Sequence, residues 1–63
     1  MGMWGDDKVF KIFYWPNPNK YHGTELLYKR VAIVTALTRS EAIFAFQKQY
    51  VGEYHTIDHV EEM

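Results

Sequence analysis

Residues 31–42, Val31-Ala-Ile-Val-Thr-Ala-Leu-Thr-Arg-Ser-Glu-Ala42, change from a strand pattern to a helix pattern within a dozen positions. The run from Val31 to Ala36 is rich in β-branched residues, which favour a strand. Thr38 is followed three places later by Glu41, the spacing of a capping box. In that motif the hydroxyl accepts the Glu41 N–H and the carboxylate reaches back to the Thr38 N–H. The stretch therefore predicts a strand that leads into a helix starting at Thr38.

The residues after Thr38 have helical periodicity. At about 100° per residue, Phe44 falls nearly opposite a packing side that gathers Ala42, Ala45, Phe46, Gln49 and Tyr50, with Ile43 at its edge. Gly52 supplies the left-handed conformation that commonly ends a helix. We therefore expect Phe46 and Tyr50 to be largely buried against the sheet and Phe44 to be exposed.

Three segments have strand patterns. Residues 8–15 are apolar on both faces, with Phe10, Ile12 and Tyr14 on one face and Val9, Lys11, Phe13 and Trp15 on the other. A loop with two prolines, 16–23, leads to a second strand at about 26–36, with an exposed end at its Lys-Arg pair and a buried end at Val-Ala-Ile-Val. Residues 54–60 form the third strand, and the tail 61–63 is expected to fray.

This order predicts one small α+β domain over residues 1–63. We expect a three-stranded antiparallel sheet in the order 2-1-3, with the most apolar strand in the centre and one helix on one face, ββαβ along the chain. A domain of this size buries only about 60% of the surface of its unfolded chain. The uncovered sheet face then presents some of Phe13, Trp15 and Tyr28 to water or to a partner.

Composition restricts the class of protein. The chain is 48% hydrophobic and 17% aromatic, which favours a compact core over disorder. It has no cysteine, which removes disulfides and thiolate zinc sites and fits a cytoplasmic location. No apolar run approaches the roughly 18 residues of a membrane helix. The net charge of −1 gives no general attraction to nucleic acid or anionic membranes.

Few residues suggest chemistry. His22, His55, Asp58 and His59 suggest a metal site, but His55 and His59 are roughly 13 Å apart if they lie on one strand. That separation is too large for ligands that must each lie about 2.1 Å from the ion. Ser40, the only serine, lies beside the helix start, where a structural role is sufficient. The sequence predicts no enzyme and no catalytic, cofactor or metal residues.

Charged and aromatic residues instead predict a binding surface. Lys8, Lys11, Lys29 and Arg30 lie near the hairpin rings, which resembles a stacking platform for single-stranded nucleic acid. Acidic residues crowd the last strand (Glu53, Asp58, Glu61, Glu62) and the start of the chain (Asp6, Asp7), so we expect a surface that is basic on one hairpin and acidic at one edge. The candidate partner-binding residues are Phe13, Trp15, Tyr28, Lys11, Lys29, Arg30, Phe44, Asp58, His59 and Glu61.

Residues 36–42, Ala-Leu-Thr-Arg-Ser-Glu-Ala, and the later Gln49-Tyr50-Val51 carry a family resemblance. The stretch from about 31 to 60 resembles the small RNA-polymerase inhibitors of short-tailed coliphages. In these a strand ends in Ala-x-Thr-x-x-Glu-Ala, the helix ends in Gln-Tyr-Val and one more strand completes the chain. The resemblance implies a three-stranded sheet with one helix, and a bacteriophage protein that serves host takeover by binding and blocking one host protein.

The resemblance does not extend to the polymerase contact. The family's last strand engages polymerase through arginines, whereas the matching stretch here offers Asp58, His59 and Glu61. We therefore expect a non-enzymatic module that inhibits or modulates a host protein, with the transcription machinery as a candidate. The alternatives are a single-stranded nucleic-acid-binding protein that uses the open aromatic face, and a small structural protein that pairs edge strands into a homodimer.

Overall fold

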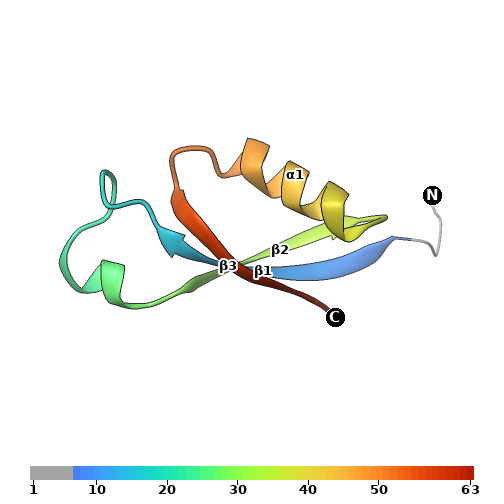
Figure 1. The fold of residues 1–63 in the computed structure, drawn as a ribbon, viewed down its shortest axis with the longest axis horizontal. Coiled ribbons are helices and arrows are strands. Elements are labelled where there is room, and N and C mark those ends of the chain that lie inside the picture. The colour runs from blue at the N-terminus through green and yellow to red at the C-terminus, as the bar shows by residue number, and fades with distance from the viewer. Residues whose placement is uncertain (1–6) are drawn as a thin grey trace.

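The computed structural model describes residues 7–63. The elements are, in chain order, β1 (Lys8–Pro16), the 3-10 helix η1 (Gly23–Leu27), β2 (Arg30–Ala36), α1 (Arg39–Gln49) and β3 (Tyr54–Glu62). Strand β1 lies between β2 and β3 and is antiparallel to both. Helix α1 lies over one face of this sheet, and among the described residues no helix covers the other (Figure 1). The expected fold class and strand order are confirmed.

The core lies between α1 and the sheet face beneath it. It gathers seven buried side chains from three elements, namely Phe10, Ile12, Tyr14, Ala32, Val34, Ala42 and Phe46. Phe46 is fully buried, and its ring centroid lies 5.1 Å from that of Tyr14, 4.8 Å from that of Tyr50 and 5.0 Å from that of Tyr54. Tyr50 itself is half-buried. The expected packing side of β1 is confirmed, as are buried Phe46 and exposed Phe44 on α1, whereas Gln49, expected on the packing side, is exposed.

The junction between β2 and α1 forms only half of the expected capping box. Thr38 is the N-cap, and its hydroxyl accepts the N–H of Glu41 at 3.2 Å. The Glu41 carboxylate accepts a hydrogen bond from the Leu37 N–H at 3.3 Å. The prediction that it bonds to the Thr38 N–H is therefore wrong. Thr38 has an extended backbone with φ −136° and ψ 163°. The Glu41 carboxylate therefore caps the amide of the residue before the N-cap.

The second strand is shorter than expected. Residues 26 and 27 belong to η1, and β2 begins at Arg30. The Glu25 carboxylate accepts the N–H of His22 at 3.2 Å, while the Glu25 N–H donates to the His22 carbonyl at 3.3 Å. This reciprocal bonding across three residues stabilises a helical turn. Gly23, with φ +65°, starts the turn in a conformation that other residues rarely adopt.

The third strand is longer than expected. It runs to Glu62, where Glu61 pairs with Lys11 and Glu62 with Phe10. The Lys8 ammonium lies 3.9 Å from the Glu62 carboxylate. The expectation that the tail frays from residue 61 is therefore wrong, because cross-strand pairing with β1 holds these two residues. Pro16 likewise belongs to β1 instead of the loop that follows it.

The loop after β1 is anchored to the turn after α1. The N–H of Asn17 donates to the Glu53 carbonyl at 3.1 Å. The Glu53 carboxylate accepts hydrogen bonds from the Lys20 ammonium at 2.6 Å and the Tyr21 hydroxyl at 2.8 Å. These bonds, that of Lys20 first, lower the pKa of the Glu53 carboxyl below its usual value. Gly52, with φ +82°, has the expected left-handed conformation, but α1 ends at Gln49, so Gly52 lies in the turn that follows the helix.

Candidate partner-binding surface

The sheet face opposite α1, termed the open face, is built from alternate residues of the three strands. Directly opposed residues of an antiparallel pair project to the same side. The residues of β2 and β3 that lie opposite the half-buried residues of β1 therefore belong to the same face. The open face contains Val9, Lys11, Phe13 and Trp15 of β1, Val31, Ile33 and Thr35 of β2, and Thr56, His59 and Glu61 of β3.

The β2 side of the open face is apolar and accessible. Val31 is 50% exposed and Ile33 is 56% exposed. Leu37, just beyond β2, is also exposed. We term these three residues the aliphatic stripe. The expected buried end at Val-Ala-Ile-Val is wrong for Val31 and Ile33, because burial alternates along β2 and only Ala32 and Val34 of this run are buried.

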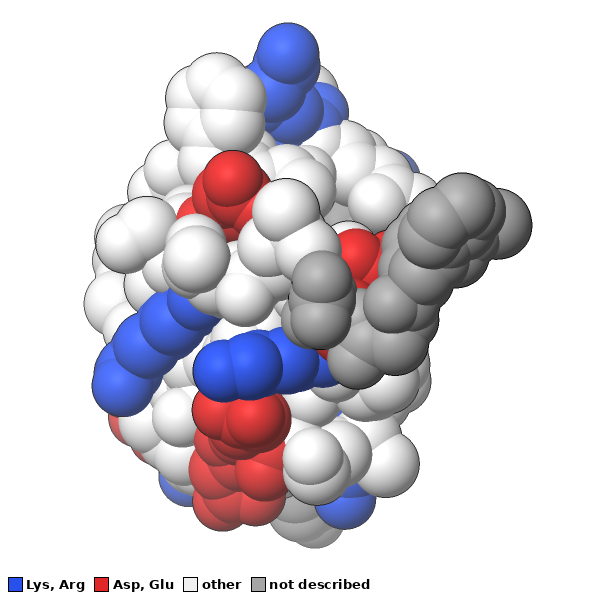
Figure 2. All heavy atoms as spheres, turned by 90° about the vertical axis from the view of Figure 1, so that its right-hand side faces the viewer, with Lys and Arg blue, Asp and Glu red and all other residues white. Residues whose placement is uncertain are grey.

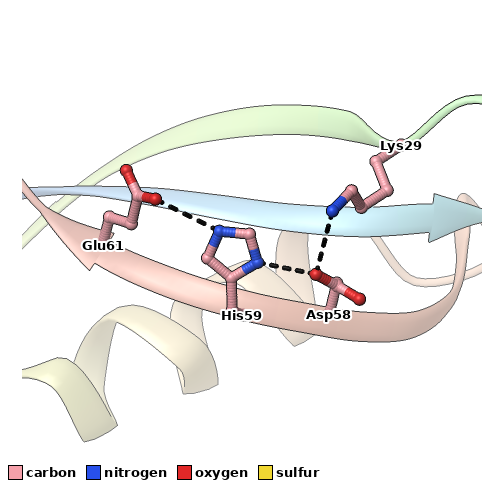
Figure 3. A network of polar contacts seen from close by, with 4 residues as sticks. All are labelled: Lys29, Asp58, His59 and Glu61. Atoms are coloured by element: carbon pink, nitrogen blue, oxygen red, sulfur yellow. Dashed lines mark hydrogen bonds and ion pairs between the residues drawn. The ribbon is translucent and has the colours of Figure 1, made fainter.

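The β3 side of the open face carries a polar network (Figure 3). The His59 ring stacks on Phe13, with centroids 4.4 Å apart and planes at 10°. Its Nδ1 lies 2.6 Å from the Asp58 carboxylate and its Nε2 lies 3.2 Å from that of Glu61. Carboxylates only accept hydrogen bonds, so both contacts are hydrogen bonds only when the imidazole carries two protons. A neutral ring donates to one of the two.

Lys29 joins this network from the opposite edge of the sheet, since it directly precedes β2. Its ammonium donates to the Asp58 carboxylate at 3.2 Å and lies 6.0 Å from the centroid of the Trp15 ring. Figure 3 shows the side chain reaching from the segment before β2 across β1 to β3. The hydrogen bond from His59, followed by that from Lys29, lowers the pKa of the Asp58 carboxyl. The Lys29–Asp58 contact thus links β3 to the segment before β2.

A β-bulge places Asp58 in this position. Phe13 opposes His59, but the next residue of β1, Tyr14, opposes Ile57, so Asp58 is an extra residue in β3. A bulge sets two residues of one strand opposite one of its partner and re-aims their side chains. Consequently Asp58 and His59, which strict alternation would send to opposite faces, both join the network.

The structure brings together seven of the ten candidate residues, which are Lys11, Phe13, Trp15, Lys29, Asp58, His59 and Glu61. Phe13 and Trp15 are half-buried, with the His59 ring stacked on Phe13 and the Lys29 ammonium 6.0 Å from the Trp15 ring centroid, so these two rings are less accessible than expected. Tyr28, next to Lys29, is 69% exposed.

Two candidates lie elsewhere. Arg30 pairs with Tyr14 and therefore projects on the α1 side, where its guanidinium lies 4.5 Å from the centroid of the Tyr21 ring. Phe44 belongs to the helix and is 61% exposed, with the Lys48 ammonium 5.2 Å from its ring centroid. Neither residue adds to the open face.

The expected separation of basic and acidic regions is wrong within the described residues, and Asp6 lies outside them. Basic side chains of the hairpin pair with acidic ones after α1, as in Lys8 with Glu62, Lys20 with Glu53 and Lys29 with Asp58. Figure 2 shows blue and red side chains interspersed on one end of the molecule. The strand order explains this mixing, because β3 lies directly beside β1 although the two are far apart in sequence.

Residues 7–63 form no pocket and no group of three His, Cys, Asp or Glu side chains placed to hold a metal ion. No helix in that range is both long and apolar enough to cross a membrane. Comparison of the chain with protein-family models, with curated proteins and with solved structures finds no match.

Proposed function

We propose that this chain is a small non-catalytic module that binds a host protein through its open face and inhibits or modulates it. The observation that carries the proposal is that the aliphatic stripe and the polar network of Lys29, Asp58, His59 and Glu61 lie on the same face of the sheet. Exposed apolar side chains beside fixed charges are the ingredients of protein interfaces, in which apolar contacts supply affinity and charges supply orientation. The resemblance of residues 31–60 to phage polymerase inhibitors makes the transcription machinery the first partner to examine.

The pairing of Lys29 favours a protein partner over single-stranded nucleic acid. Lys29 is held by Asp58 at 3.2 Å, so a phosphate group would have to displace a carboxylate there. Glu61 also brings negative charge to the same face. Stacking of bases needs free aromatic faces, whereas His59 covers the ring of Phe13.

The test is affinity capture from a bacterial lysate with the full chain, followed by binding measurements on the purified partner. Phe13→Ala should weaken binding by about 2 kcal/mol or more, the usual loss at an interface hot spot. Phe44→Ala is the matched control, because it removes an equally large ring from the helix side. Circular dichroism should show that both variants keep the native fold.

Three outcomes contradict the proposal. Loss of binding with Phe44→Ala but not with Phe13→Ala would place the interface on α1. Tight binding to oligonucleotides that falls steeply with salt would favour the nucleic-acid alternative. Unchanged partner affinity in both variants would remove the open face from consideration.

A further inference from the structure

The two edge strands of the sheet differ in how they are protected against pairing. Strand β3 has two register shifts against β1 and carries acidic side chains. Bulges and charges of this kind prevent an edge from accepting another strand. Strand β2 pairs with β1 in continuous register from Arg30 to Ala36, and residues 31–36 include no charge, proline or glycine. Among residues 7–63 no strand pairs along its outer edge, which is therefore a template for another strand.

The direction of the backbone groups on β2 follows from one hydrogen bond. The Met63 N–H donates to the Val9 carbonyl at 2.8 Å, so the backbone groups of Val9 point toward β3. Residues of an antiparallel strand alternate between its two neighbours, so those of Phe10 and Ile12 point toward β2. Their partners there, Val34 and Ala32, point back toward β1.

The residues between these partners on β2 direct their backbone N–H and C=O groups outward, away from β1. They are Val31, Ile33 and Thr35, which are also exposed. Their side chains lie on the open face, and α1 lies on the other. Three donors and three acceptors thus form an accessible row along the edge.

We propose that a second copy of this chain pairs along β2, antiparallel and about a twofold axis at Ile33, to give a continuous six-stranded sheet. In this register Ile33 lies opposite Ile33 of the partner subunit, and Val31 lies opposite Thr35 of the partner subunit. All six outward groups of each copy then meet their complements, because the three outward residues are evenly spaced about Ile33. Such a self-complementary contact closes as a dimer.

The position of Arg30 also favours the antiparallel orientation of the two β2 strands over the parallel one. Arg30, the charged end of β2, then lies opposite Ala36 of the partner subunit, so like charges do not meet. A parallel arrangement would bring the two arginines to the same end of the interface. The antiparallel contact also joins the two aliphatic stripes where the Ile33 side chains meet. The contact is short, so we expect an association that depends visibly on protein concentration.

Hydrogen exchange of individual amides tests the contact in the unmodified chain. The amides of Val31, Ile33 and Thr35 should exchange fast in dilute protein and slow down as concentration rises. Those of Ala32 and Val34, which bond to β1, should be protected at every concentration. Fast exchange of the three outward amides in a sample that sedimentation shows to be dimeric would overturn the proposal, as would a monomeric mass, near 7.5 kDa, at millimolar concentration.

A pair of variants at one position separates the backbone from the side chain. Ile33→Pro removes the central outward N–H without removing a bond to β1, since proline is tolerated where the N–H of an edge strand faces outward. Two interchain hydrogen bonds are lost by symmetry, so the dissociation constant should rise about tenfold or more. Ile33→Ala keeps the N–H and should raise it less. Equal effects of the two variants would contradict edge pairing.

Circular dichroism shows whether Ile33→Pro keeps the native fold. If this variant unfolds, amide exchange in the unmodified chain tests the edge contact instead. The hydrogen bonds of the edge contact come from the backbone of β2, so they form without the host partner, although Ile33 also belongs to the aliphatic stripe. A monomeric chain that still captures a host protein would refute only the dimer. A dimer without a host partner would refute only the proposed function.

Discussion

Replacing Phe46 with alanine should remove most of the stability of this domain. The side chain is fully buried and contacts three tyrosine rings. Truncation of such a residue costs roughly 3–5 kcal/mol. A chain of 63 residues, at roughly 0.05–0.15 kcal/mol per residue, has a free energy of unfolding of about 3–9 kcal/mol in total. Phe46→Ala should therefore leave the chain largely unfolded or close to it.

Urea denaturation followed by far-ultraviolet circular dichroism measures this loss. With a slope near 1 kcal/mol per molar urea, as expected for a small domain, the midpoint should fall by about 3 M or more. Phe46→Leu should give an intermediate fall, because it keeps apolar volume but loses ring pairs worth about 0.5–1.5 kcal/mol each. Phe44→Ala, on the exposed side of the same helix, is the control and should change the midpoint little. A native midpoint for Phe46→Ala, or equal losses at both positions, would refute the assignment of the helix face.

Three further changes test local features. Thr38→Ala removes the bond to the Glu41 N–H and should cost about 1 kcal/mol in the free energy of unfolding; coincident urea midpoints would contradict the cap. Gly52→Ala meets no atom within 4 Å, so any loss, about 1 kcal/mol, comes from its positive φ alone, and an unchanged melting temperature would argue against that backbone conformation. The folded pKa of Glu53 is lowered, so its contribution is present above its unfolded pKa, about 4.3, and is lost as pH falls through the lower folded value. The fall in unfolding free energy between pH 7 and pH 3 should therefore be smaller in Glu53→Gln, and equal falls would contradict the role of the Lys20 contact.

The sheet order and core could be predicted because their signals are local and periodic. The alternation of Phe10, Ile12 and Tyr14 identified the buried face of β1, and the helical spacing of Phe46 identified its packing side. Helix η1 was missed because Leu26 and its neighbours are apolar enough to resemble a strand. The hydrogen bond from the His22 N–H to the Glu25 carboxylate stabilises the helical turn instead. Its geometry cannot be inferred from the composition of the segment.

The polar network could be predicted only as a set of residues. Lys29 and Asp58 were both candidates, but their contact depends on the place of β3 beside β1 and on a bulge that shifts the register by one. A shift of one residue exchanges the faces of a strand, and no residue type in β3 specifies where it occurs. The exposure of Val31 and Ile33 was missed for a related reason, since an apolar run reads equally well as a buried strand until its partner is known.

The central position of β1 also has a consequence for synthesis in the cell. The strand that needs a partner on both edges precedes the other two in the chain, and β3, which covers its second edge, comes last. While the polypeptide leaves the ribosome, one edge of β1, with its aromatic side chains, remains unpaired until β3 emerges. Folding is therefore expected to finish after translation of β3, and the nascent segment is the stage at which aggregation or chaperone binding competes most strongly.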